Sequence, residues 1–135
     1  MTCVPARLDH VTVTASDLVA SLAFYDAALA PLGLHRLHEL GDEEEDDAAV
    51  EAAAYGADDG PALLWVVGGG VATRSVHVAF RAEHRSAVER FHAAAIAAAG
   101  SEHDAPRRWA IFRRGEFNAI VQDPDGNLVE AISPE

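Results

Sequence analysis

The first signal along the chain is a change of hydrophobic period that predicts a strand followed by a helix. Apolar and polar residues alternate from residue 7 to residue 14, which places Val11 and Val13 on one face and His10 on the other. Apolar residues then recur at helical spacing, as Leu18, Leu22, Tyr25 and Leu29. Pro31 and Gly33 are expected to end this helix.

The same pattern returns between Ser75 and Gly100. Laid on Leu8–Gly33 without a gap, the second stretch repeats the first through the same switch from strand to helix. The matched positions are His10 and His77, Val11 and Val78, Phe24 and Phe91, Leu29 and Ile96, and Gly33 and Gly100. We therefore interpret the chain as two copies of one module, each opening with a strand that carries a histidine.

Further strands are expected in both halves, at residues 34–40, 50–55, 62–67, 117–121 and 127–132. The segment between the second helix and Arg114 is polar and shows no period, and Asp123–Gly126 has the residues of a tight turn. The predicted fold class is α+β, with two βαβββ modules (strand, helix, then about three strands) forming a curved, cup-like sheet with helices on its outer face. One domain spans 1–135, with modules at about 7–67 and 75–132 and a linker at 68–74.

Composition narrows the classes of function. The formal net charge of −12 argues against partners that are nucleic acids or anionic membranes. Six consecutive acids at 42–47 are interpreted as a solvated loop rather than a cation site. The single cysteine excludes a disulfide within the chain, and no apolar run suits a secretory signal or a membrane span. A cytoplasmic location is therefore expected.

Three side chains are expected on the concave face, opposite the helices: His10, His77 and Glu130. Two imidazoles and a carboxylate form a facial ligand set for a divalent metal, with positions left open for water or substrate. The alternative is two structural histidines and a surface acid. Because the histidines occupy equivalent positions of a repeat, the metal interpretation is favoured.

The motifs HVTVTASDLVASLAFYDAALAPLGL, SVHVAF and DPDGNLVEAI resemble the vicinal oxygen chelate superfamily, over about Arg7–Ile132. This superfamily includes glyoxalase I, extradiol dioxygenases, fosfomycin-resistance thiol transferases and bleomycin-resistance proteins. The resemblance implies βαβββ modules, often paired in a dimer, with metal ligands on the first and last strand of each module. Carried over, these ligands are His10, His77 and Glu130, whereas the fourth position is expected at Leu63 or Leu64, which cannot bind metal.

Other residues near the cup are candidates for contacts with a ligand. The substrate-binding candidates are Arg107, Arg113, Arg114, Asn118 and Trp109, and Glu116 is the candidate catalytic base. Arginine pairs recognise carboxylate or phosphate, although here they can also simply balance charge. Trp65 is expected in the core.

Two functions from different classes remain open at this point. The first is a divalent-metal-dependent enzyme of the lyase, transferase or dioxygenase type, using zinc, iron, manganese or nickel on a small oxygenated substrate. The second is a metal-free protein that binds a small molecule or antibiotic in the same cup, as bleomycin-resistance proteins do. A domain without any ligand fits the polar cup least well. The resemblance further implies a homodimer in which His10 comes from one chain and His77 and Glu130 from the other.

Overall fold

The computed structural model describes residues 2–41, 50–108 and 115–134. The predicted acidic loop at 42–47 lies outside these residues. In chain order the elements are β1 (Val11–Thr14), α1 (Leu18–Leu29), η1 (Ala30–Leu32), β2 (His35–Gly41), β3 (Val50–Gly56), β4 (Ala62–Val67), β5 (His77–Arg81), α2 (Arg85–Ala97), β6 (Ser101–Arg108), β7 (Phe117–Gln122) and β8 (Leu128–Ser133).

The strands form two four-stranded sheets with the same topology, which confirms the predicted repeat. Their orders are β1-β4-β3-β2 and β5-β8-β7-β6. In each sheet the first strand runs parallel to the last strand of its module, while the other neighbours are antiparallel. The α+β class and the two modules are thus as predicted. The strands form two separate sheets rather than one continuous curved sheet.

Strand β6 corrects one expectation, because its segment reads as irregular in the sequence. The strand pairs with β7 at the edge of the second sheet and carries mostly exposed, polar residues. Its register shifts twice, between Glu102 and Asp104 and again before Arg107. An edge strand with such breaks does not need apolar alternation, so period-two analysis misses it.

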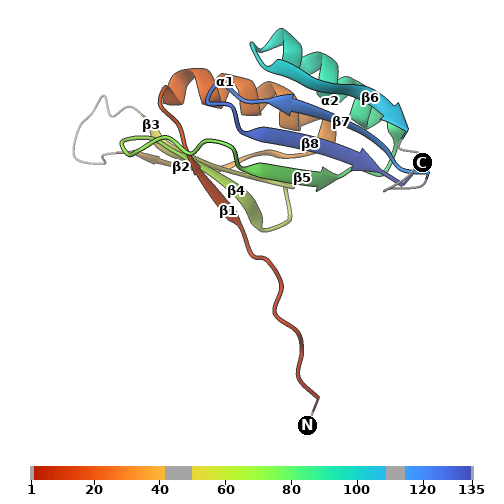
Figure 1. Ribbon diagram of the computed structural model, residues 1–135. Helices are drawn as coiled ribbons and strands as arrows, with labels where there is room; N and C mark the ends of the chain where they lie inside the picture. Colours follow the sequence, from red (N-terminus) through yellow and green to blue (C-terminus); the bar gives the residue numbers. More distant parts are fainter. Residues whose placement is uncertain (1, 42–49, 109–114, 135) are drawn as a thin grey trace.

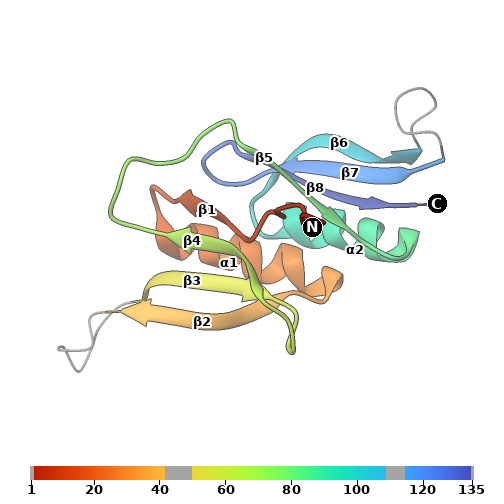
Figure 2. The same ribbon diagram turned by 90° about the horizontal axis from the view of Figure 1, so that it is seen from below.

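The two helices cover the same side of both sheets (Figures 1 and 2). Helix α1 begins at a cap in which the Asp17 side chain accepts a hydrogen bond from the backbone N–H of Ala20. The repeat-related Phe24 and Phe91 are both fully buried, in one apolar core that runs through both modules. Ile96, by contrast, is 38% exposed on α2. Among the described elements no helix covers the opposite faces of the sheets, here called the open faces, and Figure 2 looks onto them.

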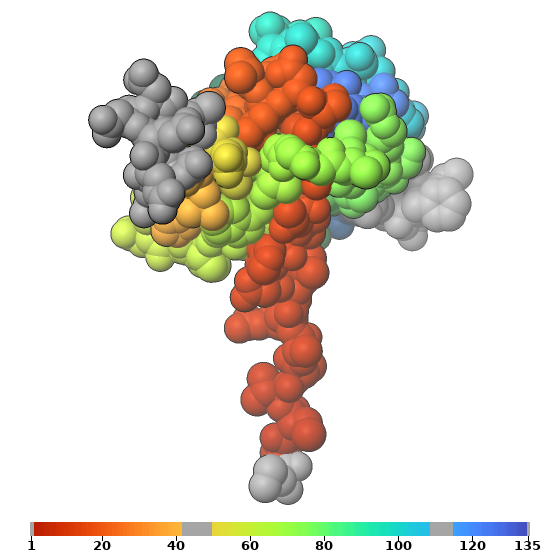
Figure 3. All heavy atoms as spheres, turned by 90° about the vertical axis from the view of Figure 1, so that its left-hand side faces the viewer, coloured from red at the N-terminus to blue at the C-terminus, as the bar shows by residue number. Residues whose placement is uncertain are grey.

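Residues 2–10 form an extended N-terminal arm in front of β1. Every residue of this arm is exposed, and it stands clear of the body on the side of the sheets away from the helices (Figures 1 and 3). Val4 and Leu8 are 91% and 82% exposed. Strand β1 therefore begins later than the predicted residue 7. Within the described residues, no helix has the length and apolar character needed to cross a membrane.

Candidate functional site

The candidate site lies on the open face of the second sheet. Strand β8 pairs Glu130 with Ala79 of β5 and with Ile120 of β7. Its neighbours Val129 and Ala131 belong to the core under the helices. Because side chains alternate along a strand, Glu130 points to the other face, which it shares with the side chains two residues away along each paired strand. The structure thereby places His77 and Asn118 beside it.

Glu130 is held from both sides although it is 2% exposed. The Nε2 atom of His77 lies 2.8 Å from the Oε1 atom of Glu130, and the Nδ2 group of Asn118 donates to Oε2 at 2.9 Å. A buried carboxylate needs such partners, because burial without them costs several kcal/mol. Asn118 is itself 1% exposed, whereas the His77 side chain is 46% exposed. One oxygen of Glu130 is therefore fixed by an amide, and the other meets an imidazole that is open to the surface.

The His77–Glu130 pair suits a divalent metal. An imidazole nitrogen and a carboxylate oxygen are both ordinary ligands, with bonds of roughly 2.0–2.2 Å. The 2.8 Å separation brings the two ligand atoms together at one place, so His77 and Glu130 are the described residues that would hold an ion there.

His10 does not join this pair within the chain. It belongs to the N-terminal arm, where its Nδ1 atom lies 2.7 Å from the Oδ1 atom of Asp9. Among residues 2–41, 50–108 and 115–134 there is no group of three side chains placed to hold a metal. The structure therefore brings together two of the three predicted ligands.

The first sheet carries an aromatic side chain where the second carries Glu130. Val11 pairs with Leu64 just as the equivalent Val78 pairs with Val129, so the counterpart of Glu130 is Trp65. This corrects the expectation of Leu63 or Leu64 as the fourth position. It also corrects the expectation of a core Trp65, which is half-buried on the open face and stacks with His38, their ring centroids 6.3 Å apart.

Further candidates surround the pair on the second sheet. Arg107 of β6 pairs with Asn118, and its Nη2 atom lies 3.7 Å from Asp104. Glu116 lies 3.9 Å from the Nη2 atom of Arg81, and its side chain is 27% exposed. Sequence reasoning missed Arg81, although its position four residues after His77 on one strand places it on the same face. Three other candidates, Trp109, Arg113 and Arg114, lie outside the described residues.

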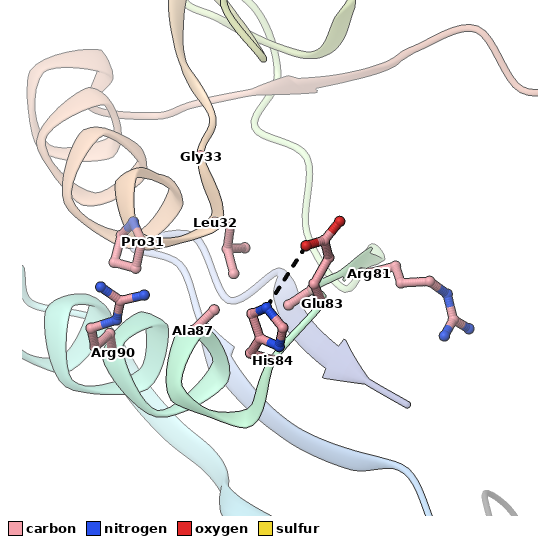
Figure 4. Close-up of a pocket in the computed structure, with 9 residues that line it drawn as sticks. Pro31, Leu32, Gly33, Arg81, Glu83, His84, Ala87 and Arg90 are labelled. Carbon is pink, nitrogen blue, oxygen red and sulfur yellow. Dashed lines mark ion pairs between the residues drawn. The ribbon is translucent and has the colours of Figure 1, made fainter. Parts of the chain in front are cut away.

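A separate cavity of about 430 Å³ lies between η1 and the start of α2. Its lining includes His84 and Glu83, whose Nε2 and Oε2 atoms lie 3.8 Å apart. Figure 4 shows this pair, with the Arg81 side chain pointing away from it. Of the residues around Glu130 named above, Arg81 alone lines it. The proposed metal ligands therefore lie on the open sheet face, outside this cavity.

Solved structures share this fold over almost the whole chain. A glyoxalase/bleomycin resistance protein from Albidiferax ferrireducens T118 is 27% identical, with a TM-score of 0.71 over 93% of this chain and 96% of the other. The fosfomycin resistance protein FosX from Listeria monocytogenes, solved with Mn(II) and sulfate, is 16% identical, with a TM-score of 0.63 over 96% and 93%.

Glyoxalase I from Zea mays is 19% identical, with a TM-score of 0.66 over 94% of this chain and 44% of its own. At such identities the likeness of FosX and glyoxalase I is one of fold. No curated protein matches the chain in sequence. The model of the Glyoxalase/Bleomycin resistance protein/Dioxygenase superfamily matches residues 7–131. Together with the repeated modules, this match shows that the chain belongs to that superfamily.

Proposed function

We propose that this protein is a divalent-metal-dependent enzyme of the lyase, transferase or dioxygenase type that acts on a small oxygenated substrate. The observation that carries the proposal is the contact between His77 and the buried Glu130, with Asn118 on the far oxygen. The His77 side chain is 46% exposed, so this pair has an open side. A metal site needs such an opening, through which substrate and water exchange.

The residues of the site have different proposed roles, which follow from how deeply each side chain is buried. His77 and Glu130 would hold the ion, and His10 would complete the facial set. When bound, the ion would polarise a substrate oxygen and stabilise negative charge that develops on it. Asn118 is buried against Glu130, so its amide fixes the orientation of that carboxylate and leaves Oε1 for the ion.

Two charged residues on the same sheet are proposed to act on the substrate, one by binding it and one as a base. Arg107, with its side chain 53% exposed, is placed to contact an anionic group of the substrate. Glu116 is the proposed base, because its partly exposed carboxylate lies near Arg81 and outside the ligand set. Trp109, Arg113 and Arg114 remain proposed substrate contacts.

We further propose that the third ligand comes from a second copy of the chain. His10 belongs to an arm whose residues are all exposed, including the apolar Val4 and Leu8. Apolar side chains on an extended segment gain free energy when another surface covers them. In a two-fold homodimer the arm of each protomer would reach the His77–Glu130 pair of its partner, which makes two equivalent cups.

The alternative function is a metal-free protein that binds a small molecule, as the resemblance to bleomycin-resistance proteins suggests. One observation favours it: Trp65, which cannot bind a metal, stands at the position equivalent to Glu130. Both functions use the same open faces, and they differ in whether an ion is retained.

Metal analysis of the untagged protein separates the two functions. Wild-type protein should retain about one ion per cup, whereas His77→Ala and Glu130→Gln should lose it because each removes a ligand. His84→Ala is the matched control, since His84 is 78% exposed and pairs with Glu83 rather than with Glu130. Wild-type protein that is as poor in metal as His77→Ala, after dialysis against zinc or manganese, would exclude the enzyme and leave the binding protein.

A further inference from the structure

We infer that Trp65 and His38 form a ring-binding platform, which takes a planar aromatic part of the ligand in the proposed cup. The inference deepens the proposed function, because it assigns a chemical class to the molecule that the cup holds. It starts from the row of paired residues that crosses the first sheet on its open face. This row consists of Thr12 on β1, Trp65 on β4, Ala54 on β3 and His38 on β2.

The position of Trp65 in the repeat points to the cup. Trp65 stands where the second module carries Glu130, the residue that holds His77. Its strand neighbours Leu64 and Val66 are 1% and 0% exposed and fill the core on the helix side. The indole ring is therefore not needed for that core. A large aromatic side chain on the open face, half-buried beside an exposed Thr12, is available to a ligand.

The partner ring extends this surface. The planes of His38 and Trp65 are inclined by only 13° and their centroids lie 6.3 Å apart, toward the upper end of the range for aromatic pairs. Ala54, between them in the row, is 0% exposed, so the two side chains close over it. His38 borders Trp65 on the β2 side, and the β1 side has only the small Thr12. A planar ring can lie against this aromatic surface without displacing a larger neighbour.

The side chains of the platform are compatible with a negatively charged aromatic ligand. The row contains no carboxylate, in a chain with 22 acidic residues. An anionic aromatic ligand is therefore not repelled at the platform itself, and Arg107 and Arg81 lie on the open face of the other sheet. A planar ring with a carboxylate is the ligand class that this arrangement fits. Aromatic rings gain free energy by stacking on the faces of Trp and His side chains, and saturated rings lack this contribution.

Two matched probes test the platform: 2-naphthoate, which is planar, and decahydro-2-naphthoate, which has the same charge and a saturated ring. Calorimetric titration of wild-type protein should give a dissociation constant about tenfold lower for 2-naphthoate. Trp65→Leu should abolish this preference, because it keeps an apolar side chain and removes the ring. His38→Ala should reduce it and His38→Phe should restore it. Leu40→Ala, which removes an exposed apolar side chain from the same face of β2, should leave it unchanged.

A second readout locates the bound ring. In a Trp109→Phe background Trp65 is the only tryptophan, because the chain has two, so one indole N–H resonance reports on it. That resonance should shift with 2-naphthoate and stay in place with the saturated probe. Equal affinities for the two probes, or a preference that survives Trp65→Leu, would overturn the platform.

Titrations with EDTA and with Mn²⁺ keep this inference apart from the proposed function. A preference for the planar probe in EDTA supports the platform even in a protein that retains no metal. Retention of metal without any preference overturns the platform and leaves the proposed enzyme standing.

Discussion

The hydroxyl of Tyr25 donates a hydrogen bond to the carboxylate of Asp123, 2.6 Å away and 98 residues further along the chain. This contact joins α1 of the first module to the turn before β8 of the second. The other oxygen of Asp123 accepts from the backbone N–H groups of Asp125 and Asn127. Asp125 in turn accepts from the backbone and hydroxyl of Ser16. The turn predicted at Asp123–Gly126 therefore also fastens the two modules together.

Tyr25→Phe should destabilise the protein by about 1.5–3 kcal/mol, because it removes a buried hydrogen bond to a charged acceptor. Denaturant unfolding measures the free-energy change. Glu83→Gln is the control: its side chain is 93% exposed in a long pair with His84, so a change within about 0.5 kcal/mol is expected. A Tyr25→Phe variant as stable as this control would mean that the contact does not hold the modules.

Stability should fall as pH rises above about 10. Burial, with the Asp123 carboxylate beside it, raises the pKa of the Tyr25 hydroxyl above its ordinary value of 10.0. Burial and a hydrogen bond to Asp26 likewise raise the pKa of Tyr55. The unfolded chain then loses these protons near pH 10 while the folded chain keeps them, so the stabilising contribution is complete below pH 10 and declines above it.

Each of these tyrosines should lower the free energy of unfolding by about 1.4 kcal/mol per pH unit in that range. The chain contains no lysine, so no lysine side chain titrates alongside them. Unfolding titrations between about pH 9 and pH 11 measure the slope. Tyr25→Phe should show a shallower slope than wild type, by one proton. Equal slopes for the two proteins would contradict the raised pKa of Tyr25.

Two adjacent residues after α2 should respond in opposite ways to small substitutions. A Cβ atom on Gly100 would lie 2.6 Å from Phe24 and 2.7 Å from the backbone oxygen of Ala95, so Gly100→Ala should cost about 1–3 kcal/mol. Ala99 adopts a left-handed backbone with φ of 68°, which favours glycine. Ala99→Gly should therefore be neutral or stabilise by up to ~1 kcal/mol. Thermal unfolding of both variants checks the order, and the reverse order would refute it.

Asn118→Leu should weaken binding of Mn²⁺ or Co²⁺ by about 10–100-fold, because it removes the donor that orients Glu130. Calorimetric titration measures the affinity, and circular dichroism checks that the variant is folded. Gln122→Ala is the control from the same strand and the same face. A folded Asn118→Leu protein with wild-type affinity would remove Asn118 from the site.

If the cup is shared between two chains, two variants that each lack one metal ligand should restore metal binding when they form a mixed dimer. His10→Ala and Glu130→Ala homodimers should each lack a full ligand set in both cups. In a mixed dimer one cup regains all three ligands, so about half of the sites per mixed dimer should bind metal again. Metal analysis after subunit exchange measures this, with light scattering to establish the dimer. A monomeric protein, or exchange that restores nothing, would refute the shared site and leave His77 and Glu130 as ligands.

Much of the fold follows from local patterns that the sequence already shows. Alternation along a strand follows from backbone geometry, so the face that Val78 occupies also decides the opposite face for His77. The ungapped repeat then predicted two equivalent modules, and the paired registers of β1 and β5 confirm it. The family resemblance rested on the same motifs and is confirmed as well.

Contacts between distant segments were decided by the tertiary structure. Strand β6 forms because the edge of β7 offers unpaired backbone groups, which outweighs its polar, aperiodic sequence. The position of Trp65 opposite Thr12 depends on the register between β1 and β4, and a shift of one residue would have turned its ring into the core. For the same reason the sequence could name Asn118 as a site residue without showing that it contacts Glu130.

The three candidate metal ligands show which features the sequence predicts and which features the tertiary structure decides. The sequence by itself determined that His10 and His77 occupy equivalent positions of a repeated unit and that Glu130 lies on the last strand, because those positions follow from local periodicity. Only the tertiary structure decided that His77 meets Glu130 while His10 stands on an exposed arm. The same local pattern is compatible with two arrangements: modules that pack together within one chain, and modules that pack between two chains. The choice between them therefore depends on surfaces that form only when the whole chain has folded.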